Sequence, residues 1–332
     1  MMENQPARFR LSVISILVLL AAISARSWMY FQVAGKQPLT PYQAGTFIGY
    51  VLMGAILAPL FFSWLAWLVF RRSSTAATIV FCLATCLLNL LAWDKNSHLH
   101  AGLEQLDKAR QNLVSSMRET MKNPVAGPAA AVDQLKSYSR KLGEATSQMQ
   151  GREKLAGEAG QRFYRLLTAK MQGYSTAVQA LQKEGFGRAK GINTRADLQH
   201  RRELVQAFAR ANQDVADFYT NAENIFRGEL QKENLDSGYI GQVLEGFRKS
   251  ASIDLVLKVR KCDAEIVDQT NKMLDLYDRE WRTWRVEDSG KVIFVNPAAV
   301  DEFQAAQNAI KDIAARQKAF QDQILQNAQA AK

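Results

Sequence analysis

The strongest constraint on this chain is a stretch of 25 residues, Thr46 to Phe70, that contains no charged side chain. At a rise of about 1.5 Å per residue, a helix of this length crosses a hydrocarbon core about 30 Å thick with room for tilt. Pro59 lies inside the stretch, and membrane helices tolerate proline. The stretch therefore predicts a transmembrane helix over residues 46–70.

Two further apolar runs flank this stretch. The run from Ala76 to Trp93 has Asn89 as its only strongly polar side chain. The run from Leu11 to Ala25 is shorter, and aromatic residues suited to a membrane interface follow it (Trp28, Tyr30 and Phe31). A cleaved signal peptide is the alternative interpretation of this first run. We expect a membrane domain over residues 1–97, with spans at about 9–31, 46–70 and 76–93.

Basic residues next to the runs predict the orientation of the membrane domain. Arg8 and Arg10 precede the first run, and Arg71 and Arg72 lie between the second and third. Cytoplasmic segments carry the excess of lysine and arginine, so both places should face the cytoplasm. The C-terminal domain then lies in the periplasm of a bacterial inner (plasma) membrane protein. A cleaved signal peptide would leave this conclusion unchanged.

Small residues in the second run indicate close helix packing. Their spacing is that of small-xxx-small motifs, in which two backbones can approach closely (Gly45, Gly49, Gly54 and Ala58). The three runs contain no ionisable residue apart from Arg26 at an edge. Proton relays and ion pathways use such groups, so the spans are expected to be an anchor in the lipid bilayer.

Residues 98–332 have the pattern of a long-helix bundle. No proline occurs between Pro128 and Pro297, and apolar residues recur at intervals of three and four in several segments. The first clear break is at residues 123–128, so the third span can continue as a helix as far as Lys122. We expect about five helices with coiled-coil-like packing. The periodicity does not distinguish a bundle within one chain from a coiled coil between chains.

Several local signals divide the bundle. A glycine-rich patch (Gly151, Gly157 and Gly160) leaves open whether one helix or two cover this region. Residues 184–193 read as a loop, and Thr194 with Asp197 resembles a capping box. One apolar stripe then runs from Leu198 to Phe226 and ends near residues 234–238, and the next runs from Leu255 to Trp284.

The segment at about 284–295 departs from the helical pattern. Its β-branched and aromatic residues surround an Asp-Ser-Gly turn, which predicts a short β-hairpin. Asn296 as cap and Pro297 at the first helical position then predict the start of the last helix. Trp281, Trp284 and Phe294 are our candidate partner surface, because aromatic residues dominate interface hot spots. The alternative is that they fill the core where the bundle changes course.

No arrangement of residues indicates catalysis or a cofactor. Gly185 and Gly187 with Arg188 and Lys190 lack the strand, helix and Gly-Lys-Ser/Thr ending of a phosphate-binding loop, so we expect a turn. His98 and His100 lack further metal ligands, and Asp275, Asp278 and Glu280 are expected to form a salt-bridged surface. The three cysteines (Cys82, Cys86 and Cys262) form no disulfide framework. We therefore expect no enzyme, no cofactor and no metal site.

Charge favours no particular partner on its own. Residues 98–200 carry 16 basic and 9 acidic side chains, which fits a solvated helical surface. Anionic lipid, acidic glycan or nucleic acid are the alternatives, and the basic patches lack the interleaved aromatics of a nucleic-acid platform. The sequence thus predicts a membrane-anchored helical scaffold or interaction module of the cell envelope that binds a second copy or an envelope protein. A ligand sensor or transporter accessory that relays changes through the third span is the alternative.

Overall fold

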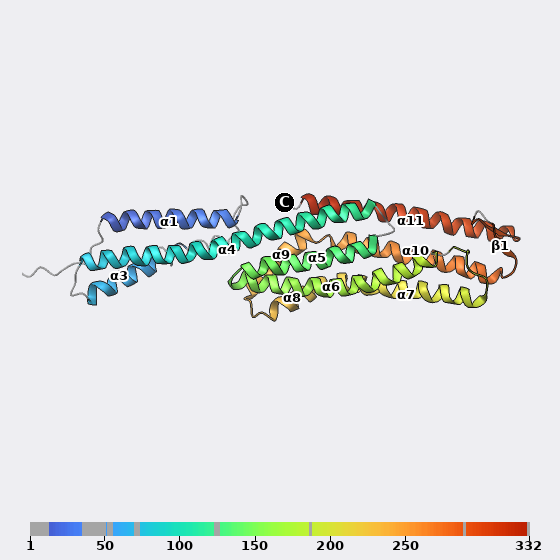
Figure 1. Cartoon of the computed structure of the whole chain (residues 1–332), viewed down its shortest axis with the longest axis horizontal. Coiled ribbons are helices and arrows are strands. Elements are labelled where there is room, and N and C mark those ends of the chain that lie inside the picture. Colours follow the sequence, from blue (N-terminus) through green and yellow to red (C-terminus); the bar gives the residue numbers. More distant parts are fainter. Residues whose placement is uncertain are drawn as a thin grey trace, which may run out of the picture. The chain divides into compact units, whose positions relative to one another are not determined.

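The structure is a computed structural model that describes residues 13–34, 51, 56–69, 74–122, 127–185, 188–287 and 290–330. It is mainly helical and, in this described part, contains one two-stranded antiparallel sheet (Figure 1). The predicted fold class is confirmed to that extent. The chain divides into two compact units, Met1–Glu104 with Ser147–Gln150 and Gln105–Thr146 with Gly151–Lys332.

The first unit contains α1 (Val13–Ala34), α3 (Ala58–Val69) and the N-terminal part of α4 (Ser74–Lys122). On α3, the Ser63 hydroxyl donates to the carbonyl oxygen of Ala77 on α4 at 2.8 Å. The rings of Trp28 on α1 and Trp93 on α4 stack with centroids 5.8 Å apart. Small and medium-sized residues are buried between these helices (Ala22, Met29, Ala66, Ala77 and Phe81).

One helix of the described part, within α4 from Thr75 to Glu119, is long and apolar enough to cross a membrane, and a shorter apolar helix covers Ser15–Met29. The sequence predicts three spans, and the structure therefore supplies one of them by this measure. The second predicted span is described only in part, because residues 46–50 and 52–55 lie outside the described residues. The first predicted span begins four residues before α1, and residues 9–12 also lie outside them.

Arg26 does not mark the end of the first apolar helix. Helix α1 continues through it to Ala34, and Arg26 is only 4% exposed. Its Nε donates to Asn89 Oδ1 at 3.2 Å, and its Nη2 donates to the Leu88 carbonyl oxygen at 3.0 Å. Acceptors on α4 thus compensate for the burial of the guanidinium, which explains why the charge does not terminate α1.

The second unit holds the remaining elements together with the C-terminal part of α4 (Figure 1). They are α5 (Gly127–Gln148), α6 (Gly151–Lys183), α7 (Arg195–Thr220), α8 (Ala222–Gln231), α9 (Ser237–Ser250), α10 (Ile253–Arg279), β1 (Trp284–Val286), β2 (Val292–Phe294) and α11 (Pro297–Ala330). The helix break that the sequence left open occurs just before the glycine-rich patch, where Gly151 has φ 64°. Gly157 and Gly160 lie inside α6.

Two apolar cores hold these helices together. One lies between α6, α7, α10, the hairpin and the start of α11, with Tyr277 fully buried in it. The other lies between the N-terminal half of α6, the end of α7, α8 and α9, where the Phe163 ring contacts those of Phe218, Phe226 and Phe247. Both cores are built from side chains spaced three and four residues apart, as amphipathic helices require.

Two predicted helix boundaries in this unit are wrong. The helix expected to cover Leu198 to Phe226 ends at Thr220, because Asn221 leaves the helical conformation with φ −101° and ψ 7°. Residues 234–238, read only as a terminator, also start α9, since the Asp236 carboxylate accepts a hydrogen bond from the Tyr239 N–H at 2.8 Å. In the described part, α5 to α11 are seven helices, more than the five expected.

The hairpin and the capping motifs form as the sequence predicts. Strands β1 and β2 pair with Arg285 opposite Ile293. Thr194 and Asp197 form a reciprocal capping box at the start of α7. The tryptophan stripe differs: α10 ends at Arg279, and Arg282 has φ 70°. This left-handed residue turns the chain, so Trp281 and Trp284 lie beyond the helix.

Candidate partner-binding site

A pocket of about 540 Å³ lies at the hairpin end of the second unit. The loop between α6 and α7 forms one side, through residues 189–193, and the segment that follows α10 forms the other. The latter contributes Trp281, Arg282 and residues 284–287. Segments about 90 residues apart in the sequence thus meet at one site.

Arg201 on α7 holds the loop side of the pocket in place. Its side chain is 6% exposed, and Nη2 donates to the Lys190 carbonyl oxygen at 3.2 Å. The same nitrogen lies 3.7 Å from Glu184 Oε2. The loop turns at Gly185 and Gly191, which have φ 88° and 90° and therefore favour glycine. Arg201 Nη1 is buried without a hydrogen-bond partner in the described part of the chain.

The hairpin side is fixed by aromatic contacts with α10. Trp284 Nε1 donates to the Tyr277 carbonyl oxygen at 2.9 Å, and the two rings lie 5.0 Å apart. The ring of Trp281 meets that of Trp284 edge-on at 6.1 Å. Both tryptophans are half-buried and line the pocket.

Phe294 occupies a different position from the two tryptophans. It is 6% exposed, and its ring stacks on Tyr277 at 6.1 Å and contacts Phe303 at 5.4 Å. Of the three residues in the predicted partner surface, Trp281 and Trp284 face a pocket, whereas Phe294 packs in the core below them.

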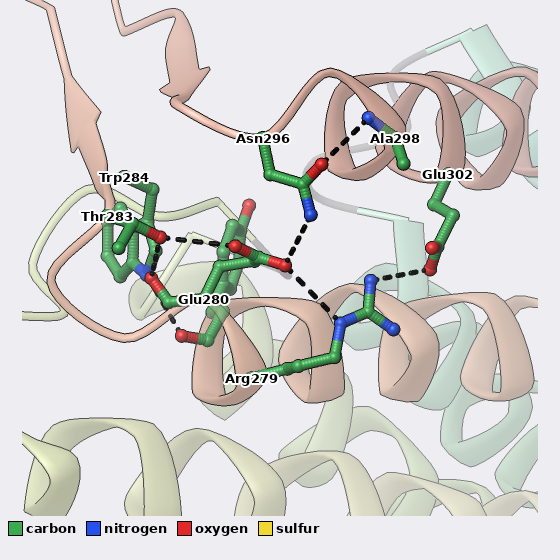
Figure 2. Close-up of polar contacts among 8 residues, drawn as sticks. Arg279, Glu280, Thr283, Trp284, Asn296, Ala298 and Glu302 are labelled. Carbon is green, nitrogen blue, oxygen red and sulfur yellow. Dashed lines mark hydrogen bonds and ion pairs between the residues drawn. The ribbon is translucent and has the colours of Figure 1, made fainter.

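Glu280 joins the hairpin to the start of α11 (Figure 2). Its carboxylate accepts hydrogen bonds from Asn296 Nδ2 at 3.1 Å and from the Thr283 hydroxyl at 3.2 Å, and it pairs with Arg279 Nε at 3.5 Å. The hydrogen bond from Asn296, followed by those from Thr283 and Arg279, holds the pKa of Glu280 below its ordinary value. Asn296 Oδ1 also accepts from the Ala298 N–H at 3.1 Å, which caps α11.

Positive charge predominates around the pocket. Lys190, Arg282 and Arg285 line it and are exposed, and Glu287 is the only acidic residue of the lining. Neighbouring Arg195 lies over the Trp281 ring at 6.0 Å and 3.7 Å from Asp278 Oδ1. The arrangement can therefore bind an anionic group beside an aromatic surface.

Sequence reasoning did not bring Lys190 together with Arg282 and Arg285. The local signal was the run Trp-Arg-Thr-Trp-Arg at residues 281–285, in which cations alternate with aromatic positions. The contact with the loop had no local signal, because it depends on how α6, α7 and α10 pack. The pocket could be found only from the fold.

Other polar residues that the sequence singled out have structural partners. Asp275 and Asp278 pair with Arg202 at 2.9 and 3.3 Å, as a salt-bridged surface requires. His98 contacts Asp94 at 3.6 Å. Arg260, expected in a basic surface patch, is buried instead and pairs with Asp263 at 3.1 Å.

Metal ligands and the packing and topology residues complete the comparison with the sequence. Within the described ranges, no group of three or more His, Cys, Asp or Glu side chains could hold a metal ion. The predicted topology determinants (Arg8, Arg10, Arg71 and Arg72) and three of the small packing residues (Gly45, Gly49 and Gly54) lie outside the described residues. The fourth packing residue, Ala58, is the first residue of α3.

Comparisons with protein-family models, curated proteins and solved structures give no match.

Proposed function

We propose that the chain is a non-enzymatic, membrane-anchored helical scaffold or interaction module of the bacterial cell envelope. In this proposal the first unit is a three-span anchor with a cytoplasmic N-terminus. The second unit is a periplasmic bundle that engages a protein partner, either another envelope protein or a second copy, at its hairpin end.

The exposed apolar side chains of the first unit carry the proposal. Large hydrophobic residues on all three described helices are 43–67% exposed (Ile16, Leu17, Leu20 and Trp28 on α1; Phe61, Phe62, Trp64 and Leu65 on α3; Ile79, Leu83, Leu87, Leu90, Leu91 and Trp93 on α4). Soluble monomers rarely expose so much continuous apolar surface, whereas a lipid-facing surface requires it. This supports a membrane role for α1 and α3 as well as α4.

The orientation rests on the sequence. Arg8, Arg10, Arg71 and Arg72 flank the proposed cytoplasmic ends of the spans, and the segment between the first two spans has Lys36 as its only basic residue. Alkaline phosphatase and green fluorescent protein, fused separately after Lys332, test this orientation. We expect phosphatase activity without fluorescence. Fluorescence without phosphatase activity would reverse the assigned orientation.

Site-specific photo-crosslinking in cells tests the interaction module. A photoreactive amino acid at position 285, on the pocket rim, should give protein adducts that are absent when it replaces Arg210. Arg210 is an exposed residue of α7 outside the pocket lining and is therefore a matched control. Equal adducts at both positions, or none at either, would count against a partner-binding hairpin end.

The continuity of α4 favours a second candidate function, a ligand sensor or transporter accessory. This helix runs from Ser74 to Lys122 and contributes residues to both units. A shift of its C-terminal part could therefore be passed to the third span as a movement of one rigid helix. Insertion of a flexible Gly-Ser segment after Asp94 should abolish a relay but leave crosslinking at position 285 intact if the protein is a scaffold.

A further inference from the structure

The hydrogen bonds of the hairpin leave one edge of β1 without a strand partner. The Glu287 N–H donates to the Lys291 carbonyl oxygen and the Val295 N–H donates to that of Thr283, each at 2.9 Å. Hydrogen-bonded residues alternate along an antiparallel strand. The main-chain groups of Trp284 and Val286 therefore point away from β2, and the described sheet has no third strand.

The pocket follows this free edge. Trp284 and Val286 both line it, and the loop at residues 189–193 forms its other side. Its volume of about 540 Å³ is within the range of about 300–1,000 Å³ typical of ligand sites. An extended chain placed here would lie alongside β1.

The charges of the lining select the chemistry of that chain. Lys190, Arg282 and Arg285 are exposed and take part in no ion pair within the described residues. Buried Arg201 beneath the loop adds a cation whose Nη1 has no hydrogen-bond partner there. Glu287 is the only acidic group of the lining, so an anionic occupant is favoured over a neutral or basic one.

We propose that the pocket binds an extended acidic peptide segment of a partner protein, which adds as a strand to the free edge of β1. Its main chain pairs with Trp284 and Val286, its carboxylates meet Lys190, Arg282 and Arg285, and an apolar side chain packs on Trp281. Such strand addition draws affinity from main-chain hydrogen bonds and specificity from alternate side chains. The inference rests on the proposed function, because it names the partner of that interaction module.

A randomised octapeptide library selected against the full chain in lipid nanodiscs tests the proposal. Parallel selections use the Arg282→Glu/Arg285→Glu variant and the control Arg210→Glu. We expect peptides rich in Asp and Glu to be enriched by the wild type and by Arg210→Glu, and to lose at least about tenfold in affinity for the double variant. If no enriched peptide depends on Arg282 and Arg285, the proposal is wrong, and these cations serve only to keep the strand edge from pairing.

Backbone methylation separates strand addition from simple charge attraction. The best library peptide is synthesised with N-methyl groups on alternate amides, in both registers, and its affinity is measured by fluorescence anisotropy. One register should lose at least about tenfold and the other should bind nearly unchanged, because only alternate amides face β1. Equal binding of both registers, or equally tight binding of heparin, would overturn a peptide strand in favour of a general anionic site.

Both mutated side chains are exposed, so circular dichroism should show the same helix content in the variant and the wild type. Failure of the peptide proposal is distinguishable from failure of the proposed function. Crosslinks at position 285 without arginine-dependent acidic peptides would leave the interaction module intact and reject only the acidic strand.

Discussion

Gly157 on α6 lies directly against Thr146 on α5, so closely that a β-carbon at position 157 would be 2.4 Å from Thr146 Oγ1. It would also be 2.8 Å from Cγ2 and 3.1 Å from Cβ of the same residue. Thr146 is 2% exposed and β-branched, so it has few alternative rotamers. The absence of a side chain at Gly157 therefore sets the separation of α5 and α6.

Gly157→Ala should destabilise the second unit. Overpacking against Thr146 costs about 1–3 kcal/mol, which exceeds the gain of up to about 1 kcal/mol from removing glycine from a helix. Thermal unfolding of the full chain, followed by circular dichroism, should show a lower midpoint. Gly173→Ala in the same helix is the matched control, because its β-carbon would meet nothing within 4 Å. It should raise the midpoint, and the same sign for both variants would contradict the close contact.

Arg162 on α6 links this helix to the end of α8. Its Nε donates to Glu229 Oε2 at 2.8 Å and its Nη2 to Glu233 Oε1 at 2.6 Å. Hydrogen bonds from these carboxylates raise the pKa of Arg162, although burial opposes the effect. The Glu229 side chain is only 9% exposed, so it depends on its cationic partners.

Arg162→Ala should lower the free energy of unfolding by about 2 kcal/mol, because it leaves Glu229 with one cationic partner fewer. Hydrogen–deuterium exchange in the α6 and α8 peptides of the full chain measures the loss locally. Arg140→Ala is the control, because Arg140 and Glu144 form an exposed pair within one helix. That variant should change exchange by no more than about 0.5 kcal/mol. Similar effects of the two substitutions would show that burial of Glu229 is unimportant.

Asp263 lies at the centre of a buried polar cluster between α6, α10 and α11. It accepts hydrogen bonds from the Tyr174 hydroxyl at 3.0 Å and from Gln317 Nε2 at 2.7 Å. Arg260 Nη1 lies 3.1 Å from Asp263 Oδ2, in ion-pair contact but outside hydrogen-bonding alignment. The guanidinium also stacks over the Tyr174 ring at 4.4 Å. Burial raises the pKa of the Tyr174 hydroxyl, so it stays a proton donor.

Asp263→Leu should destabilise the protein by about 3 kcal/mol or more, because it leaves a buried guanidinium without its carboxylate. The double variant Arg260→Met/Asp263→Leu should recover most of this loss, since apolar residues of similar volume often replace a buried ion pair without penalty. Denaturant unfolding of the full chain compares the two. A double variant less stable than the single one would show that Arg260 stabilises the core through Tyr174 rather than through Asp263.

Local signals predicted the elements of the second unit well. The capping box at Thr194, the start of α11 after Asn296 and the hairpin at about 284–295 each depend on residues within five positions of one another. Such contacts are written in the sequence itself. The helices also follow the apolar stripes, because a buried face needs a side chain every three or four residues.

Features that depend on tertiary contacts could not be predicted. Asn221 interrupts an apolar stripe that is continuous in sequence. Arg26 stays inside α1 because Asn89, 63 residues later, supplies an acceptor. The pocket needs Lys190 and Arg285 on elements that meet only after α6, α7 and α10 have packed. Each of these features requires the fold before its residues can be grouped.

Glu223 on α8 gives the second unit a dependence on acid. Arg248 on α9 donates to both of its carboxylate oxygens, at 2.7 and 2.6 Å, and Arg227 donates to Oε1 at 2.9 Å. The hydrogen bond from Arg248 is the largest cause that lowers the pKa of Glu223 from 4.5 to about 2. Between these values the unfolded chain binds a proton that the folded chain does not.

The stabilisation from Glu223 is therefore fully present above about pH 4.5 and is lost as the pH falls from 4.5 to about 2. Glu223→Gln removes this contribution. The difference in thermal midpoint between the wild type and Glu223→Gln should be constant near neutral pH and shrink towards zero at pH 2. Other carboxylates cancel in this difference, because both proteins contain them. Asp268→Asn is the control, since Asp268 is exposed and forms no ion pair in the described part. If the difference persists at pH 2, the ion pair between Glu223 and Arg248 does not account for the effect.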